Sequence, residues 1–249
     1  MLNRVSIQLN GTTVSIVNNP EEAPKPVGFI TAIVLLSLSA ALLSLALFGW
    51  IAEEMLEGAT IRFDTSIRLW IHGFASPQLT RFMNSVTTLG WQGLFIGFLV
   101  AAVVFWKLQW KRAIGWLAIS LSGSALLTVA LKHEFQRPRP LPFFGPVLNS
   151  YSFPSGHSLS SFCFYGVLAG LITARVRPLW IRVIVWTVSA LLILLIGVSR
   201  IYLGVHYPSD VIAGYLAALV WVSSLVLADR VRKTRKGLKV VTVADEVPE

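Results

Sequence analysis

Six stretches of the sequence contain no Asp, Glu, Lys or Arg, and they constrain the fold more than any other feature. They cover residues 27–51, 89–106, 113–131, 155–174, 183–199 and 211–228. A helix needs roughly 20 mainly apolar residues to cross the hydrocarbon core of a bilayer, and the last three stretches lie near the short limit. The pattern therefore predicts an all-α bundle of six transmembrane helices, which puts both termini on one side.

The overall composition agrees with a membrane setting. The chain has 249 residues, of which 55% are hydrophobic and only 13% are charged, and its mean hydropathy is +0.69. An ordinary soluble domain is less apolar than this. The first stretch lacks a basic flank and a small-residue cleavage site, so we expect it to stay as a transmembrane helix. We expect one integral-membrane domain over residues 1–249, with disordered tails at about 1–25 and 237–249.

The distribution of basic residues predicts the orientation. Fourteen of the 21 Lys and Arg residues fall in the tails and loops on the side of the termini, and seven fall on the other side. Cytoplasmic loops carry an excess of Lys and Arg, so the termini should be cytoplasmic. In a bacterium the protein would lie in the inner membrane, with the opposite loops facing the periplasm. The net charge of +9 fits anionic headgroups better than nucleic acid, because no basic run is interleaved with stacking aromatics.

The segment between the first two stretches has helical patterns of its own. Asp64 and Ser76-Pro77 have the residue types of helix starts. Apolar residues then recur at helical spacing: Leu79, Phe82, Met83 and Val86. We predict two short amphipathic helices on the outer membrane surface, with Trp70 and Phe74 at headgroup depth.

Three polar blocks near the ends of the later stretches carry residue types that suit a phosphate ester. They read KHEFQRPRP from Lys132, PSGH from Pro154, and SRIYLGVHYPSD from Ser199. The set resembles the type 2 phosphatidic acid phosphatase (PAP2) superfamily, whose motif is K-x6-RP, PSGH and SR-x5-H-x3-D, and no motif position departs from it. The resemblance implies a membrane lipid phosphatase that works through a phosphohistidine.

The third block contains a candidate nucleophile, His206. Pro208 has the character of a first helical residue, which puts Asp210 in the first turn of the last helix. A carboxylate four residues after His206 can hold one imidazole nitrogen and leave the other free to attack phosphorus. Taken alone, His206 would more often be an interfacial residue that caps the helix.

The second block contains a candidate general acid and base, His157. It lies at the predicted start of the fourth span, where free backbone N–H groups and the helix dipole favour an anion. Ser155 can donate a hydrogen bond, and Gly156 allows close approach of the backbone. A mere capping turn is compatible with this interpretation, because the same geometry creates the anion site.

Lys132, Arg139 and Arg200 are the candidate phosphate-binding cations. Each is costly at membrane depth unless it meets an anion, and together they can stabilise a phosphoryl transition state without a metal. We therefore expect no metal site and no cofactor. Arg137, like Arg62 and Arg68, lies outside the motif, and we interpret it as an interfacial anchor.

The substrate class follows from the resemblance, but the individual lipid does not. Undecaprenyl diphosphate is the favoured substrate, with phosphatidate and phosphatidylglycerophosphate as alternatives. A lipid-to-lipid phosphotransferase would use the same phosphohistidine, and a lipid transporter would need ionisable groups near the bilayer midplane. Vanadium haloperoxidases share the motif but are soluble. The predicted partners are the lipid substrate and the bilayer; the oligomeric state is left open.

Overall fold

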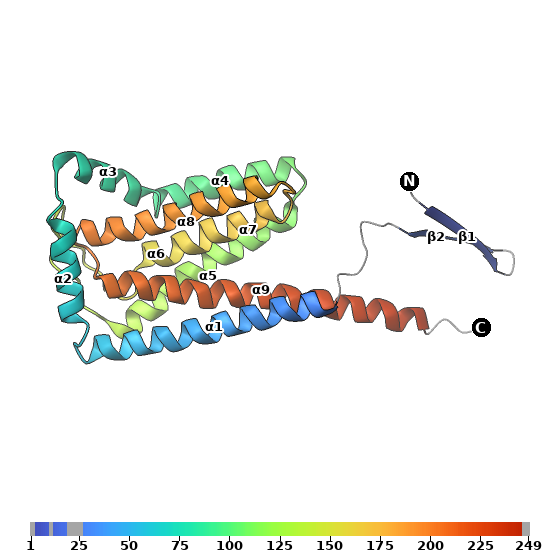
Figure 1. The fold of residues 1–249 in the computed structure, drawn as a ribbon, viewed down its shortest axis with the longest axis horizontal. Helices are drawn as coiled ribbons and strands as arrows, with labels where there is room; N and C mark the ends of the chain where they lie inside the picture. Colours follow the sequence, from blue (N-terminus) through green and yellow to red (C-terminus); the bar gives the residue numbers. More distant parts are fainter. Residues whose placement is uncertain (1–2, 10–11, 19–26, 246–249) are drawn as a thin grey trace. The chain divides into compact units, whose positions relative to one another are not determined.

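The computed structural model describes residues 3–9, 12–18 and 27–245, and its contacts divide the chain into two units, residues 1–36 and 37–249. In the first unit, strand β1 (Asn3–Leu9) pairs antiparallel with β2 (Thr12–Asn18) (Figure 1). β-Branched residues occur in both strands and are frequent in β2, which favours extended structure. This differs from the predicted disordered tail; residues 1–2, 10–11, 19–26 and 246–249 lie outside the described part.

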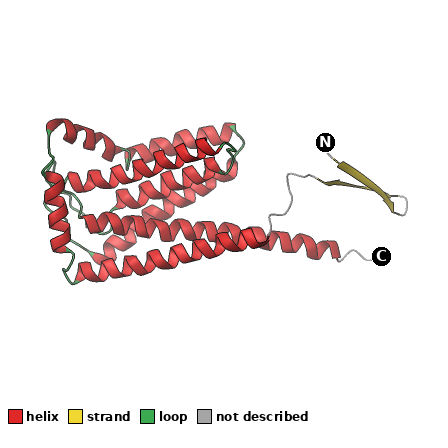
Figure 2. Cartoon of the chain, in the orientation of Figure 1, coloured by secondary structure: helices red, strands yellow, loops and turns green. Residues whose placement is uncertain are grey.

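Helices dominate the rest of the described chain (Figure 2). Their bounds are α1 Val27–Leu56, α2 Ile61–His72, α3 Pro77–Thr88, α4 Gln92–Lys107, α5 Lys111–Phe135, α6 Gly156–Ser161, α7 Val167–Thr173, α8 Leu179–Tyr202 and α9 Pro208–Asp245. A π-helical turn, Phe162–Gly166, joins α6 to α7. The predicted all-α membrane unit is therefore confirmed for residues 37–245, and α9 continues as a helix into the tail predicted to be disordered from residue 237.

Helices lie over all six charge-free stretches, but they differ in length. Among the described residues, four helices are long and apolar enough to cross a membrane: Val34–Leu56, Lys111–Phe135, Leu179–Tyr202 and Pro208–Arg232. The pair α3 and α4, bent by 47°, passes the same test together. The π-helical turn divides the stretch 155–174 into pieces too short to qualify. Six crossings therefore remain a prediction.

The two short helices predicted between the first spans are present as α2 and α3. Ser76 caps α3, because its hydroxyl accepts a hydrogen bond from Leu79 N at 3.2 Å, and Pro77 is the first helical residue. The predicted start at Asp64 was wrong. Helix α2 begins at Ile61, and Asp64 is fully buried in its first turn, where it serves the tertiary contacts described below.

Close packing brings the starts of α6 and α9 together. A buried cluster joins α1, α6, the π-helical turn and α9: Phe48, Ala52, Met55, Phe153, Leu159, Cys163, Ala213, Ala217 and Ala218. At Gly214 of α9, an added Cβ would lie 2.7 Å from Ser155 O and 2.9 Å from Ser158 Cβ. Only a residue without a side chain allows this approach, so Gly214 helps to set the distance between two of the motif blocks.

The two ends of the bundle differ in what they carry. The end of α5, the start of α6, the end of α8 and the start of α9 lie at the end of the bundle where α2 lies (Figure 1). The loops at the other end carry basic residues, and there the Arg175 guanidinium lies 4.3 Å from the centre of the Trp110 ring. The sequence motifs therefore meet at one end, away from the most basic loops.

Candidate active site

His206 is buried at the centre of the motif residues, in the loop that precedes α9. Its Nδ1 lies 3.3 Å from Asp210 Oδ2, and its Nε2 lies 3.0 Å from Arg139 Nη1. The carboxylate can only accept and the guanidinium can only donate, so the two contacts fit one tautomer, with the proton on Nδ1 and a lone pair on Nε2. The lone pair therefore faces the cationic part of the site.

The surroundings of His206 favour its neutral form. Burial lowers the pKa of the imidazole well below its usual value, and the positive charges of Arg139, Arg200 and Lys132 lower it further. The three cations named by the motif thus act on one histidine from one loop and two helix ends. A neutral, uncharged ring is the form that a nucleophile needs.

Arg139 is held by main-chain oxygens beside His206. Its Nη1 donates to Val205 O at 2.7 Å, and its Nε donates to Ser150 O at 2.8 Å. Its Nη2 donates to Ser150 Oγ at 3.0 Å. Burial lowers the pKa of Arg139, although a guanidinium stays charged at neutral pH. The side chain is therefore fixed in place without losing its charge to a carboxylate.

Lys132 and Arg200 complete the cationic group from the ends of α5 and α8. Lys132 Nζ donates to Tyr151 O. Arg200 is only 7% exposed, and its Nη1 donates to Thr87 Oγ1 at 2.7 Å. Its buried Nε has no hydrogen-bond partner among the residues that the structure describes. Within the described part of the chain, Lys132, Arg139 and Arg200 make no salt bridge to a carboxylate. Their charge is left available for an anion.

The PSGH block forms the start of α6. Ser155 is its N-cap, with its hydroxyl accepting from Ser158 N at 3.4 Å and from Ser158 Oγ at 3.0 Å. Gly156 packs against α5, since an added Cβ would lie 2.8 Å from Thr128 Cγ2. Ser155 N donates to Asp210 O at 2.9 Å, which joins the starts of α6 and α9 through the main chain.

His157 lies one residue into α6, facing the same group of charges. Its ring stacks near Trp91, with ring centres 6.1 Å apart and planes 23° from parallel. Arg200 and His206 both interact with it electrostatically. Gly90 lies against it, because an added Cβ there would be 2.9 Å from His157 Cδ2. The structure therefore brings the second histidine to the same end of the bundle as the first, on a different helix.

Arg137 is not the interfacial anchor that the sequence suggested. It is 8% exposed, and its guanidinium lies between two fully buried carboxylates. Nη1 donates to Asp210 Oδ1 at 2.7 Å, and Nη2 donates to Asp64 Oδ2 at 2.7 Å. Asp64 also accepts from Ser209 N at 2.9 Å and from Ser209 Oγ at 2.7 Å. The anchor interpretation failed because position outside a motif does not reveal a buried partner from a distant helix.

Arg68 also differs from its predicted role as an anchor. Its Nη2 donates to Leu141 O at 2.9 Å and to Gly204 O at 3.2 Å, and its guanidinium lies 4.8 Å from the centre of the Phe143 ring. Burial lowers the pKa of Arg68. This arginine fastens the loop after Arg139 to the loop before His206. Arg62, six residues earlier on α2, is exposed.

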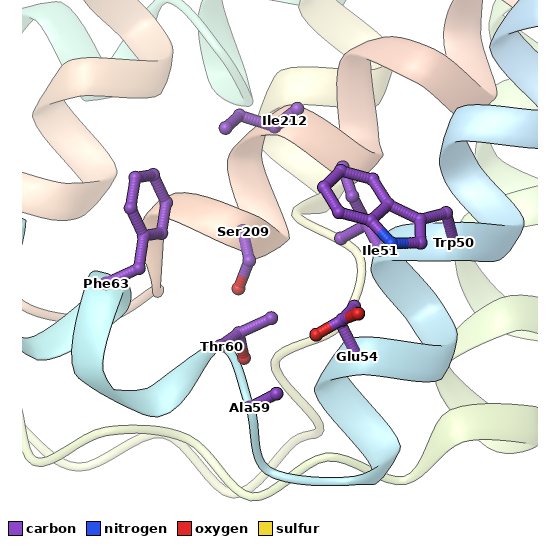
Figure 3. Close-up of a pocket in the computed structure, with 8 residues that line it drawn as sticks. All are labelled: Trp50, Ile51, Glu54, Ala59, Thr60, Phe63, Ser209 and Ile212. Carbon is purple, nitrogen blue, oxygen red and sulfur yellow. The ribbon is translucent and has the colours of Figure 1, made fainter.

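Two cavities flank the network of Asp64, Arg137 and Asp210 and do not open on either histidine. One, of about 280 Å³, is lined by residues of α1, α2 and α9 together with the loop between α1 and α2 (Figure 3): Trp50, Ile51, Glu54, Ala59, Thr60, Phe63, Ser209 and Ile212. The second, of about 320 Å³, has Arg137 and Tyr207 in its wall. The candidate site is therefore identified by the side chains that converge on His206, and not by the size of a cavity.

Comparison with known proteins agrees with this geometry. Residues 113–233 match the PAP2 superfamily. The chain is 32% identical to phosphatidylglycerophosphatase B of Bacillus subtilis over 151 residues, which cover 58% of this chain and 72% of that relative. The chain belongs to the PAP2 superfamily. The matched region includes every motif residue from Lys132 to Asp210.

Other members of the PAP2 superfamily carry different names. The chain is 34% identical over 115 residues to an undecaprenyl-diphosphatase of Sulfolobus acidocaldarius and 31% identical over 171 residues to a lipid A 1-phosphatase of Rhizobium johnstonii. It spans 51% and 58% of the length of these two relatives. All three relatives are named as phosphatases, and their names point to different lipids.

A solved PAP2 structure has the same fold. The crystal structure of a transmembrane PAP2 type phosphatidylglycerolphosphate phosphatase from Bacillus subtilis matches with a TM-score of 0.68 at 24% identity, covering 79% of this chain and 96% of that one. The fold and the apolar helices together identify this PAP2 protein as an integral membrane protein.

The motif did not reveal Thr87 and Arg137, which contact the motif residues Arg200 and Asp210, or Asp64, which contacts Arg137. The sequence held one usable signal for Arg137. It is the first arginine of an Arg-Pro-Arg-Pro run, and two arginines in one short loop of a membrane protein need partners. Asp64 and Thr87 lie on α2 and α3, and their contacts depend on how these helices dock against α8 and α9.

Proposed function

We propose that this membrane lipid phosphatase of the PAP2 superfamily removes a phosphate group from a lipid through a phosphohistidine at His206. The observation that carries the proposal is the contact of His206 Nε2 with Arg139 at 3.0 Å, beside two further cations that have no carboxylate partner among the described residues. A phosphate group entering there would take the guanidinium hydrogen bonds and lie next to the lone pair.

In the first step the Nε2 lone pair forms a bond to phosphorus, and the bond from phosphorus to the leaving oxygen breaks. His157 gives its proton to that oxygen, which is a poor leaving group when unprotonated. The negative phosphate beside His157 favours the protonated ring at the start of the step. Asp210 holds the Nδ1 proton and stabilises the positive ring that forms.

In the second step water replaces the histidine. His157, now neutral, takes a proton from water, whose oxygen bonds to phosphorus as the bond to Nε2 breaks. Lys132, Arg139 and Arg200 stabilise the negative charge on the equatorial oxygens in both steps. Ser155 and Gly156 at the start of α6 offer further donors, as helix starts do for phosphate. These positive groups can supply the electrostatic stabilisation without a metal ion.

The substrate is proposed to present its head from the bilayer while its tail stays in lipid. Each methylene kept in an apolar medium contributes about 0.8 kcal/mol, so the tail sets where the head is presented and the cations need recognise only the head. Undecaprenyl diphosphate is our first candidate, because an outward-facing site suits a carrier whose diphosphate is released there. Phosphatidylglycerophosphate is the second, because a relative named for that activity matches over 72% of its length.

The orientation is proposed from the distribution of Lys and Arg, with the termini in the cytoplasm and the motif residues on the periplasmic side of an inner membrane. A cysteine at Asn149, near the motif residues, should react with a membrane-impermeant thiol reagent in intact spheroplasts. A cysteine at Ala174, at the opposite end of the bundle, should react only after lysis; the native Cys163 is buried and gives the background. The reverse pattern would put the chemistry in the cytoplasm.

The decisive experiment measures phosphate release by purified protein. Undecaprenyl diphosphate, phosphatidate, phosphatidylglycerophosphate and p-nitrophenyl phosphate are compared in matched detergent micelles. We expect a higher kcat/KM on at least one lipid than on the soluble ester. An equal or better result on the soluble ester would refute the lipid preference, and a clear preference for a glycerophospholipid would refute only the first candidate. Transfer of labelled phosphate to a second lipid instead of water would identify a phosphotransferase.

A further inference from the structure

We propose that Asp64 and Arg137 are positioning residues for the phosphatase reaction, which hold Asp210 so that one of its oxygens faces His206. This inference rests on the proposed function, because it assigns a purpose to contacts around the proposed nucleophile. Neither residue belongs to the motif. Neither touches the reacting atoms, so their effect on the chemistry would pass through Asp210.

The two oxygens of Asp210 meet different groups. Oδ1 accepts from Arg137 Nη1 at 2.7 Å. Oδ2 accepts from Tyr207 N at 2.9 Å and lies 3.3 Å from His206 Nδ1. A carboxylate held at one oxygen by a short charge-assisted hydrogen bond cannot rotate freely, so the other oxygen is presented in a fixed direction to the imidazole. The shorter contact is thus the one that orients the carboxylate, and the longer one is the contact with the nucleophile.

Arg137 is in turn fixed from its other nitrogen. Nη2 donates to Asp64 Oδ2 at 2.7 Å and to Thr60 Oγ1 at 3.3 Å. Ser209 Oγ accepts from Arg137 Nη1 at 2.8 Å and donates to Asp64 at 2.7 Å, which closes the network between α2 and the start of α9. The Tyr207 ring covers the guanidinium at 4.0 Å. The two terminal nitrogens of the Arg137 guanidinium therefore have two hydrogen-bond partners each.

The charge of this group matters as much as its geometry. Two buried carboxylates share one guanidinium, so Arg137 neutralises only part of the charge on Asp210. Without Asp64, the whole positive charge of Arg137 would act on Asp210 and weaken its hold on the His206 proton. Buried ion pairs are poor sources of stability, because desolvation offsets their attraction. Their position beside the proposed nucleophile is better explained by control of the His206 imidazole.

The two residues should therefore shift the pKa of His206 in opposite directions. Without the charge of Arg137, the negative charge of Asp210 acts more strongly on His206, so the pKa of His206 rises. Removing the charge of Asp64 has the reverse effect and lowers it. Both variants keep the other groups that act on His206. These are the charged residues Lys132, Arg139 and Arg200, together with His157. Loss of packing alone has no reason to produce shifts of opposite sign.

The test uses full-length protein in detergent micelles, with phosphatidate, phosphatidylglycerophosphate and undecaprenyl diphosphate as substrates. The variants are Arg137→Met, Asp64→Asn and the double variant, and Arg62→Met, an exposed arginine on α2, is the control. On the best of the three lipids, Arg137→Met should lower kcat roughly 100-fold, the scale of a small misplacement of a reacting group, with KM within about twofold. The acid limb of kcat/KM should move to higher pH in Arg137→Met and to lower pH in Asp64→Asn.

The double variant separates positioning from folding. It removes both charges together, so its thermal midpoint should recover towards wild type relative to Arg137→Met, while its kcat stays low. If no lipid yields phosphate with the wild type, the proposed function is overturned. If the wild type is active and folded Arg137→Met and double variants keep its kcat and its acid limb, only the positioning role is overturned. Arg62→Met should match wild type in every measurement, and equal losses in it would also overturn that role.

Discussion

Arg137 and Arg139 are separated by a single proline, and they have opposite surroundings. Arg137 is bonded to two carboxylates and is 8% exposed. Arg139 is bonded to main-chain oxygens, a serine hydroxyl and the lone pair of His206. One guanidinium has its charge compensated inside the protein. The charge of the other guanidinium, that of Arg139, remains available to an anionic ligand.

The comparison teaches that charge compensation, and not proximity, separates the proposed phosphate-binding arginine from the proposed supporting one. A guanidinium between two carboxylates has little attraction left for a phosphate, whereas one held by neutral oxygens retains it. Both arginines approach the same proposed catalytic pair, His206 and Asp210, from opposite sides. Arg139 lies at Nε2 of His206, and Arg137 lies behind Asp210 at the Nδ1 side.

The largest expected effect comes from His206, where the two regions meet. His206→Ala removes the proposed nucleophile, so phosphate release should fall by at least about 1,000-fold with little change in thermal midpoint. Asp210→Asn should also reduce it strongly, by loosening the imidazole. Labelled substrate quenched without acid should leave phosphate on wild type. Equal labelling of His206→Ala would show that another residue is the nucleophile. The contrast between Arg137 and Arg139 would then lose its reference point.

A second experiment compares the two arginines directly through inhibition by inorganic phosphate. Arg139→Met should weaken inhibition roughly 10- to 100-fold, because a hydrogen bond to a charged group contributes about 1.5–3 kcal/mol. Arg137→Met should leave the inhibition constant within about twofold, since its charge is already compensated. The inhibition constants of both variants are measured beside wild type. Equal weakening by both substitutions would contradict the distinction between them.

The pH dependence sharpens the role of Arg139. Its positive charge lowers the pKa of His206, so Arg139→Met should raise that pKa. Activity requires the neutral imidazole, and the acid limb of kcat/KM should therefore move to higher pH. Arg62→Met serves as the matched removal of a positive charge away from the site. If the acid limb of kcat/KM stays in place or moves to lower pH in Arg139→Met, Arg139 does not act on the proposed nucleophile.

The smallest expected effect is that of a chelator. Lys132, Arg139 and Arg200 supply positive charge at the site, and the described residues contain no group of three or more His, Cys, Asp or Glu that could hold a metal ion. Phosphate release after EDTA treatment should equal the untreated rate. Complete loss of phosphate release in EDTA, with recovery when a divalent metal is added, would contradict this prediction. The positive charge at the site would then have to come from a metal ion as well as from the arginines.

The sequence predicted the helical elements well, because charge-free stretches and helix-start residues act locally. The start of α3 at Pro77 and the start of α9 at Pro208 both follow from such signals. The sequence did not predict the π-helical turn at Phe162–Gly166 or the extent of α9. The start of α2 was also missed, because Asp64 is recruited by tertiary contacts and not by the helix terminus.

The motif predicted which residues gather around His206, and it could not predict what supports them. The four-residue spacing from His206 to Asp210 does not determine what the second carboxylate oxygen of Asp210 contacts. Its partner, Arg137, is 73 residues away from Asp210 along the chain, and Asp64 is likewise 73 residues from Arg137. Such contacts depend on the docking of α2, which no local pattern encodes. Supporting residues are thus visible only once the helices are arranged.

The hydrogen bond from Ser155 N to Asp210 O has a consequence for how such enzymes diversify. It ties the helix of one histidine to the helix that follows the other, and it uses no side-chain atom. At the two bonded positions, only a proline in place of Ser155 would remove one of the bonding atoms. Mutations can therefore change the side chains that would meet a lipid head while this main-chain link between the starts of α6 and α9 stays available.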